Sequence, residues 1–154
     1  MLASTASPNP LLACKSNCLA DQDNFQPAAV YIHAGTMAGR TIALIDDDEQ
    51  IRASLQRLLA GFGYRSECFA SGGDFLAAAG AWDCLVIDLQ LGATSGLELA
   101  QHPAVQALKL PIIITSGTSN TALWKQALAL QCAGYLRKPF DAKELLQALR
   151  RAGI

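Results

Sequence analysis

Five short apolar runs recur from residue 41 onwards, and segments with helical spacing separate them. The runs cover 41–45, 64–69, 84–88, 112–115 and 134–137. Their length and their aliphatic content predict β-strands, and the strand at 84–88 is expected to be buried. Strands that alternate with helices in this order predict an α/β fold with a parallel sheet and helices on both of its faces.

The segments between these runs carry the signals of amphipathic helices. Ile51, Leu55, Leu58 and Leu59 follow the spacing i, i+4, i+7, i+8, which places them on one helical face. Glycines at 61 and 63 end that helix. Further helices are expected after Ser71, from about Ser95 to the residue before Pro103, over about 120–131, and after Asp141, where Glu144 completes a capping box.

Composition divides the chain into two parts. The chain has 154 residues, 51% of them hydrophobic, which is enough for one domain with a sizeable core. Residues 1–39 contain prolines and small polar residues without periodicity, and they predict a disordered extension before a folded domain over 40–154. Met37 is a plausible alternative start of translation. The five cysteines are an odd count at irregular spacing, which argues against a disulfide framework and fits a cytoplasmic protein.

Charged residues follow three of the predicted strands. Asp46, Asp47 and Asp48 come after the first, Asp88 ends the third, and Lys138 follows the last. Functional groups of an open parallel sheet gather beyond the carboxyl ends of its strands, so these side chains should meet there. Clustered carboxylates need a cation, and oxygen ligands with room for water suit Mg²⁺. Asp48 is expected instead to cap the first helix.

These residues make the chain resemble a bacterial response-regulator receiver domain of two-component signalling, from about residue 40 to about 151. The resemblance rests on five separate pieces in the right order. The pieces are Ile45-Asp-Asp-Asp48, Val86-Ile-Asp-Leu89, Ser95-Gly-Leu-Glu-Leu99, Ile112-Ile-Ile-Thr115-Ser-Gly117 and Ala133-Gly-Tyr-Leu-Arg-Lys-Pro-Phe140. It implies a doubly wound, flavodoxin-like (βα)5 three-layer sandwich with sheet order 2-1-3-4-5. The single-domain type is expected because the sequence runs only a few residues past the last predicted helix.

The resemblance also implies an acceptor and a metal site. Asp88 would accept a phosphoryl group, because carboxylates serve as covalent acceptors. Asp47 would bind Mg²⁺ directly together with Asp88, and Asp46 would act mainly through water. Gln90 would lend its backbone carbonyl to the same ion.

Three further residues take roles by resemblance. Lys138, before a cis Pro139, would contact the phosphoryl oxygens, while the metal contacts the carboxylates. The Thr115 hydroxyl would reach the same oxygens, so Asp88, Thr115 and Lys138 form the expected catalytic set. Thr115 and Tyr135 would form the conformational switch, although Tyr135 is also a candidate core residue. Ser116 stands where the family commonly has a smaller residue, and it is expected to narrow access to the site.

The expected partners are proteins. The resemblance implies phosphorylation by a histidine kinase or a histidine phosphotransfer protein, followed by a change of the surface that a downstream partner reads. Trp124 and Leu128 lie beside the inward stripe of their helix and mark either a partner surface or a wide core stripe. With a net charge of −1, direct nucleic-acid or membrane binding is not expected, and a homodimer is possible.

Alternatives of other classes remain open. The chain is expected to catalyse only its own phosphorylation and dephosphorylation, and not to be an enzyme acting on a metabolite. A magnesium phosphatase would carry a second aspartate two residues after Asp88, where this chain has Gln90. A flavin or redox module on the same fold is a further alternative. The chain could also be the receiver fragment of a DNA-binding transcriptional regulator that lacks its output domain.

Overall fold

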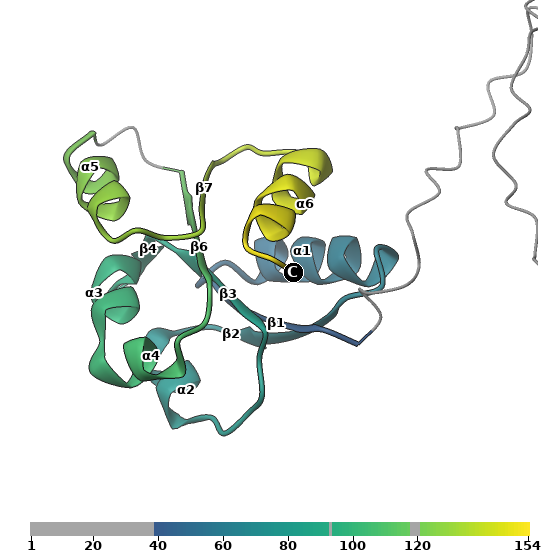
Figure 1. The fold of residues 1–154 in the computed structure, drawn as a ribbon, viewed down its shortest axis with the longest axis horizontal. Helices are drawn as coiled ribbons and strands as arrows, with labels where there is room; N and C mark the ends of the chain where they lie inside the picture. Colours follow the sequence, from purple (N-terminus) through teal and green to yellow (C-terminus); the bar gives the residue numbers. More distant parts are fainter. Residues whose placement is uncertain (1–38, 93, 118–120) are drawn as a thin grey trace, which may run out of the picture. The chain divides into compact units, whose positions relative to one another are not determined.

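One parallel sheet organises the folded part of the chain. The computed structural model describes residues 39–92, 94–117 and 121–154, so the expected extension up to residue 38 lies outside it, with Met37, Cys14 and Cys18. The strands are β1 (Thr41–Ile45), β2 (Arg65–Phe69), β3 (Cys84–Asp88), β6 (Ile112–Ser116) and β7 (Gly134–Arg137). Their order is β2-β1-β3-β6-β7, and every pairing is parallel (Figure 1). Counted over these five strands, the order is the expected 2-1-3-4-5.

Helices cover both faces of this sheet, which confirms the doubly wound, flavodoxin-like α/β fold. The helices α1 (Glu49–Gly61) and α6 (Ala142–Arg151) pack on one face. The helices α2 (Gly72–Ala77), α3 (Gly96–Gln101), α4 (Pro103–Leu108) and α5 (Thr121–Ala129) pack on the other (Figure 1). The expected sandwich of helix, sheet and helix is therefore present.

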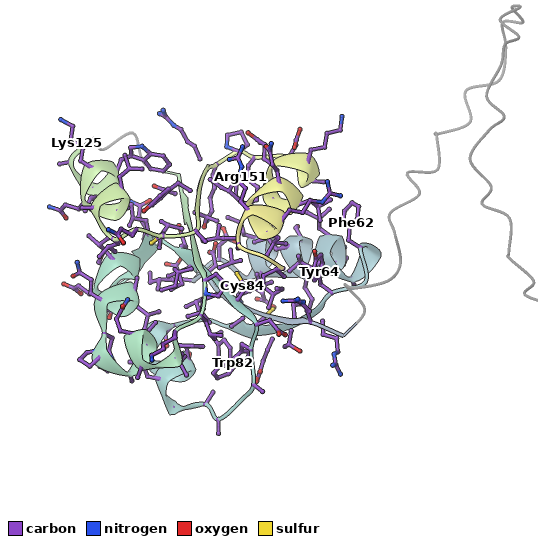
Figure 2. The ribbon with its side chains drawn as sticks, in the orientation of Figure 1. Phe62, Tyr64, Trp82, Cys84, Lys125 and Arg151 are labelled. Atoms are coloured by element: carbon purple, nitrogen blue, oxygen red, sulfur yellow. The ribbon has the colours of Figure 1, made fainter. Side chains whose placement is uncertain are left out.

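Each face of the sheet has its own apolar layer. Leu55 and Leu59 of α1 are buried in one layer, and Ile51 and Leu58 pack partly buried against it, as their spacing predicts. Figure 2 shows Trp82 on the opposite side of the sheet, near α2. There the ring of Trp82 packs against Phe69 and Phe75. The two layers bury the central strands β1, β3 and β6 from both sides, and this packing positions their carboxyl ends.

The helix caps and most boundaries agree with the sequence. Asp48 accepts hydrogen bonds from the N–H groups of Gln50 at 2.8 Å and Ile51 at 3.2 Å, which confirms its role as the cap of α1. Ser71, Ser95 and Asp141 cap α2, α3 and α6, and Glu144 completes the capping box of α6. Strand β2 begins at Arg65, one residue later than expected.

Three local features differ from the sequence prediction. A short antiparallel hairpin of β4 (Gln90–Leu91) and β5 (Thr94–Ser95) was not expected. The helix expected to stop before Pro103 does stop there, but Pro103 begins the additional helix α4, because proline suits the first helical position. Helix α5 ends at Ala129 rather than about 131, and the left-handed φ of 52° at Gln131 cannot continue a helix.

None of the helices in the described ranges is long and apolar enough to cross a membrane. The register of the parallel strands determines which side chains meet at the carboxyl edge of the sheet. Ile45 of β1 lies beside Ile87 of β3, Asp88 lies beside Thr115, and Thr115 lies beside Leu136 of β7. Residues that follow these strand ends therefore meet at one edge of the sheet.

Candidate functional site

The structure brings four of the expected site residues together beyond the carboxyl ends of the strands. Asp46 directly follows β1, Asp88 is the last residue of β3, Thr115 lies in β6, and Lys138 directly follows β7. Asp46, Asp88 and Thr115 are all buried, at 3%, 6% and 1% exposure. Buried polar groups are rare unless they are paired or functional, so this cluster is the candidate site of the fold.

Lys138 links two of the carboxylates. Its Nζ lies 2.7 Å from Asp46 Oδ2 and 3.1 Å from Asp88 Oδ2. Burial alone would lower the pKa of Lys138, but the hydrogen bond that Lys138 donates to Asp46 and the negative charges of Asp88 and Asp46 outweigh burial and raise the pKa above its usual range. The ammonium therefore stays charged. The sequence assigned the carboxylates to the metal and not to Lys138, and in this respect it is wrong, because the side chain already contacts two of them. The Lys138–Pro139 peptide bond is cis, as expected.

Asp88 keeps one oxygen without a partner. Within the described part of the chain, its Oδ1 is buried and accepts no hydrogen bond. Burial raises the pKa of Asp88, and the Lys138 ammonium opposes that rise. A buried carboxylate oxygen without a donor costs free energy, so it is normally found where a ligand supplies the missing contact.

The third carboxylate completes a site that fits a cation. Asp46, Asp47 and Asp88 can each offer one oxygen, and these oxygens lie within 4.8 Å of one another. Asp47 is exposed, so one side of the cluster is open to water. Acidic oxygens with an open, hydrated side are the ligands that Mg²⁺ prefers. The unpaired Asp88 oxygen and the chemistry of this set therefore fit the magnesium ion expected from the sequence.

Two residues that the sequence analysis did not single out complete the site. A Cβ on Gly96 would lie 1.9 Å from the backbone carbonyl oxygen of Asp88, so only glycine fits between α3 and the end of β3. Arg52 of α1 donates a hydrogen bond to the backbone carbonyl of Asp46 at 2.5 Å. For Gly96, the sequence signal was a glycine directly after Ser95, the predicted start of a helix. For Arg52 the only available signal was its position one turn after the acidic run.

The remaining site residues are placed as follows. Gln90 is exposed at the start of β4, two residues after Asp88. The role of its backbone carbonyl as a metal ligand stays a prediction. Ser116 is fully buried at the end of β6, and its expected narrowing of the access to Asp88 stays a prediction. Leu91 is buried at 4% exposure and Gly92 adopts a left-handed φ of 59°, which closes the β4–β5 hairpin beside the site.

Tyr135 is held tightly on the α5 side of the sheet. Its hydroxyl donates to the carbonyl of Ala127 and accepts from the N–H of Cys132 at 3.2 Å. Its ring meets Trp124 edge-on, with centroids 5.5 Å apart. Burial raises the pKa of Tyr135 to about 12. We call this arrangement of Ala127, Cys132, Tyr135 and Trp124 the tyrosine clasp.

The side chains beside the inward stripe of α5 differ from each other. Ala127 is fully buried, and Leu123 and Leu130 pack partly buried against the same core layer, as expected. Leu128 is 50% exposed, so the wide core stripe is wrong for this residue. Trp124 is half-buried against Tyr135. The outer face of α5 therefore presents an apolar group to solvent.

The structure combines a doubly wound parallel sheet with an acidic cluster and a lysine beyond the carboxyl ends of its strands. Comparison of the sequence with known proteins identifies the family that has this combination. The sequence matches the family model described as response regulator receiver domain over residues 42–150. The chain belongs to the response regulator receiver domain family.

Individual relatives agree with this assignment. The chain is 32% identical over 113 residues to the response regulator protein TmoT of Ectopseudomonas mendocina, covering 72% of this chain and 51% of TmoT. It is 32% identical over 111 residues to the transcriptional regulatory protein FixJ of Azorhizobium caulinodans, covering 71% and 53%. The chain thus spans about half the length of these curated relatives.

A solved structure supports the fold in three dimensions. The chemotaxis protein CheY4 of Vibrio cholerae is similar with a TM-score of 0.66 and 27% sequence identity, covering 75% of this chain and 98% of CheY4. The core described above is therefore the whole fold of that protein.

Proposed function

We propose that this receiver domain accepts a phosphoryl group on Asp88 and passes the change to a protein partner. The observation that carries the proposal is the unpaired, buried Oδ1 of Asp88 beside the Lys138 ammonium. The lysine lies 3.1 Å from the other oxygen of the same carboxylate, where it can neutralise charge on an incoming phosphoryl group. Membership of the receiver family supports the same reading.

The transfer balances without any oxidant or reductant. An Asp88 oxygen attacks the phosphorus of a phosphohistidine whose ring is protonated, and a new O–P bond forms. The N–P bond breaks, and the imidazole leaves with the electron pair as a neutral ring. The product is an acyl phosphate on Asp88. Because the attack needs the carboxylate anion, the raised pKa of Asp88 makes the transfer slower as the solution becomes more acidic.

Asp47 and Asp88 would hold Mg²⁺ directly, Asp46 would act mainly through water, and Gln90 would add its backbone carbonyl. When bound, the ion neutralises charge on the carboxylates and on the phosphoryl oxygens. The geometry agrees with the indirect role of Asp46. One of its oxygens accepts the Asp48 N–H at 2.9 Å and the other accepts Lys138, so both already have partners.

The protein that donates the phosphoryl group would be a histidine kinase or a histidine phosphotransfer protein. A groove of about 560 Å³ lies beside Lys138, and its apolar lining includes Ile51, Leu55 and Phe140. Because Lys138 belongs to both the groove and the acidic site, a donor seated in the groove would face Asp88. Apolar side chains rimmed by polar ones, here Asp48, Gln50 and Ser54, are typical of a surface that contacts another protein, which suits a protein donor.

The output would be a change of the face formed by α5, β7 and α6. The phosphoryl group would draw Lys138 and the Thr115 hydroxyl towards its oxygens. Since Lys138 directly follows β7 and Tyr135 lies within it, this movement would strain the tyrosine clasp. The exposed Leu128 would then be part of the surface that a downstream partner reads. In this account the chain catalyses only its own phosphorylation and dephosphorylation in the cytoplasm.

A second reading concerns the length of the gene product. FixJ of A. caulinodans is a transcriptional regulatory protein, and this chain covers 53% of it. The chain could therefore be the receiver part of a DNA-binding regulator. A reading frame that continues beyond Ile154 into a further domain would favour this alternative, and a stop codon there would favour the single-domain type.

The test is labelling by a small phosphodonor. Acetyl phosphate with Mg²⁺ should add the mass of one phosphoryl group to the wild type and none to Asp88→Asn. Asp48→Asn is the matched control, because Asp48 only caps α1 and asparagine caps equally well. Retention of the added mass in Asp88→Asn, with the label mapped to another carboxylate, would overturn the assignment.

A further inference from the structure

Arg52 contacts the acidic site through the backbone of Asp46 and not through its carboxylate. It lies one turn into α1, and its own N–H makes an ordinary helical bond to the carbonyl of Asp48 at 3.0 Å. The half-buried side chain turns back instead, so that Nη1 donates to the backbone carbonyl oxygen of Asp46 at 2.5 Å. A guanidinium that donates to a carbonyl makes a charge-assisted hydrogen bond, stronger than a neutral one.

The carbonyl that Arg52 holds belongs to the peptide group between Asp46 and Asp47. That group is planar, so fixing its oxygen fixes the direction in which the chain enters Asp47. Asp46 is also held by other contacts: its N–H donates to the carbonyl of Phe69 at 3.2 Å, and its carboxylate accepts Asp48 and Lys138. In the described part of the chain, Arg52 is the side chain that holds this peptide plane.

Asp47 needs such support more than its neighbours do. It is exposed, and among the described residues no hydrogen bond to its carboxylate holds it in place. Its direction therefore depends on the backbone on either side. Asp46 and Asp88, by contrast, are both tied to Lys138.

We propose that Arg52 is a positioning residue, which sets the Asp46–Asp47 peptide plane and so directs the Asp47 carboxylate towards the cation. This inference rests on the proposed magnesium site. Residues that orient a metal ligand commonly change metal affinity 10–100-fold when they are replaced. We expect Arg52→Met to weaken Mg²⁺ binding about tenfold, which corresponds to about 1.4 kcal/mol.

The sign of this effect separates positioning from simple electrostatics. Arg52 is a cation near a cation site, so its charge alone opposes Mg²⁺ binding. If charge were its whole contribution, Arg52→Met would bind Mg²⁺ more tightly than the wild type. Weaker binding therefore requires that the lost hydrogen bond matters more than the lost repulsion.

Arg57 provides the matched control on the same helix. It is exposed, and its Nε donates to the carbonyl of Ala53 within α1 at 3.2 Å. Arg57→Met is the same substitution as Arg52→Met and removes the same charge from the same helix, but Arg57 makes no contact with Asp46. Magnesium titration by calorimetry should give wild-type affinity for Arg57→Met and weakened affinity for Arg52→Met. Arg52→Lys keeps a donor and a charge, so it should recover part of the loss.

Amide NMR gives a readout that a loss of overall stability would not produce. In Arg52→Met without metal, the amide of Asp47 should shift, since its peptide group loses the hydrogen bond, while amides of α6 stay in place. If Arg52→Met does not fold, Arg52→Lys carries the same test with a smaller loss of affinity. Equal or tighter Mg²⁺ binding in a folded Arg52 variant overturns the positioning role and leaves the phosphoacceptor assignment intact. Absence of Mg²⁺ binding in the wild type overturns both.

Discussion

The acidic site and the tyrosine clasp are joined by the same short strand, yet their polar groups are satisfied to very different degrees. At the site, three carboxylates lie close together but only two of them, Asp46 and Asp88, contact the Lys138 ammonium, and a buried oxygen of Asp88 has no partner in the described part of the chain. In the clasp, the Tyr135 hydroxyl donates one hydrogen bond and accepts another, and its ring packs on Trp124. Strand β7 joins them, with Tyr135 inside it and Lys138 directly after it.

This difference suggests separate roles in the proposed switch: the acidic site would bind the ligand, and the tyrosine clasp would hold the unliganded conformation. The site carries uncompensated charge, so a cation or phosphoryl ligand is favoured there. The clasp has its hydrogen bonds made, so in the proposed switch it would resist rearrangement until the site supplied enough free energy. Moving a two-state equilibrium from mostly one state to mostly the other needs roughly 5.5 kcal/mol. One hydrogen bond to a charged group supplies about 1.5–3 kcal/mol, so Lys138 and Thr115 must act together.

Gly96→Ala should have the largest effect on stability, because it disturbs the packing of α3 against the end of β3, where the site lies. The new Cβ would lie 1.9 Å from the Asp88 carbonyl oxygen, so β3 and α3 would have to separate. We expect a loss of about 4 kcal/mol or more in the free energy of unfolding, measured by urea denaturation. Gly61→Ala is the control, since nothing lies within 4 Å of its Cβ, and it should be neutral or slightly stabilising. Near-wild-type stability of Gly96→Ala would contradict the packing described here.

Lys138→Ala should follow, because it leaves Asp46 and Asp88 without their shared cation. Removing one partner of a buried ion pair typically costs 3–5 kcal/mol, and we expect about 3 kcal/mol in Mg²⁺-free buffer. Mg²⁺ should restore more stability to this variant than to the wild type. Lys143→Ala, an exposed lysine of α6, should change stability by less than about 0.5 kcal/mol. Equal effects of the two substitutions would mean that the Lys138 contacts contribute no stability.

Tyr135→Phe tests the clasp alone. It removes the donor to Ala127 and the acceptor for Cys132 while keeping the ring against Trp124. We expect a loss of about 1–2 kcal/mol at neutral pH. The pKa of Tyr135 is raised to about 12, above the usual value near 10. The folded wild type therefore holds this proton longer than the unfolded chain does, and its advantage over the variant should decline between about pH 10 and 12. A pH-independent difference between the two would argue against a buried hydroxyl.

Asp88→Asn should have the smallest effect, and in the opposite direction. Its raised pKa means that the folded state disfavours the charged carboxylate, so the substitution should stabilise the protein at neutral pH. An unpaired buried polar group costs about 1–3 kcal/mol, and we expect a gain at the low end of this range, because asparagine also loses the contact with Lys138. The penalty on the wild type is fully present above its raised pKa and fades as the pH falls through that value towards the unfolded-state pKa. Thermal unfolding of both proteins across this acidic range checks the sign. A destabilised Asp88→Asn at neutral pH would mean that the Lys138 pair outweighs burial.

Much of the fold was predictable because its signals are local. The spacing of Leu55 and Leu59, the caps at Asp48, Ser95 and Asp141, and the apolar runs each depend on neighbours a few residues away. The strand order came from resemblance, since periodicity does not encode which strands pair. Helix α4 was missed because Pro103 was read as a stop, although it also suits the first position of a new helix.

The candidate site was predictable in composition but not in contacts. Aspartates and a lysine after predicted strands indicate where charges meet, and the structure brings Asp46, Asp88 and Lys138 together. The sequence does not show that Lys138 already pairs with both carboxylates, or that Gly96 touches the Asp88 carbonyl. Both are distances between residues far apart in the chain. The return of Arg52 onto the Asp46 carbonyl depends on a rotamer that no sequence pattern specifies.

The most direct test of the coupling between site and clasp is the amide resonance of Cys132, whose N–H donates to the Tyr135 hydroxyl. Beryllofluoride with Mg²⁺, which mimics the phosphoryl group, should shift this resonance in the wild type, because filling the site strains the clasp through β7. It should leave the resonance unchanged in Asp88→Asn. A wild type that binds beryllofluoride at Asp88 while the Cys132 amide stays in place would contradict the account.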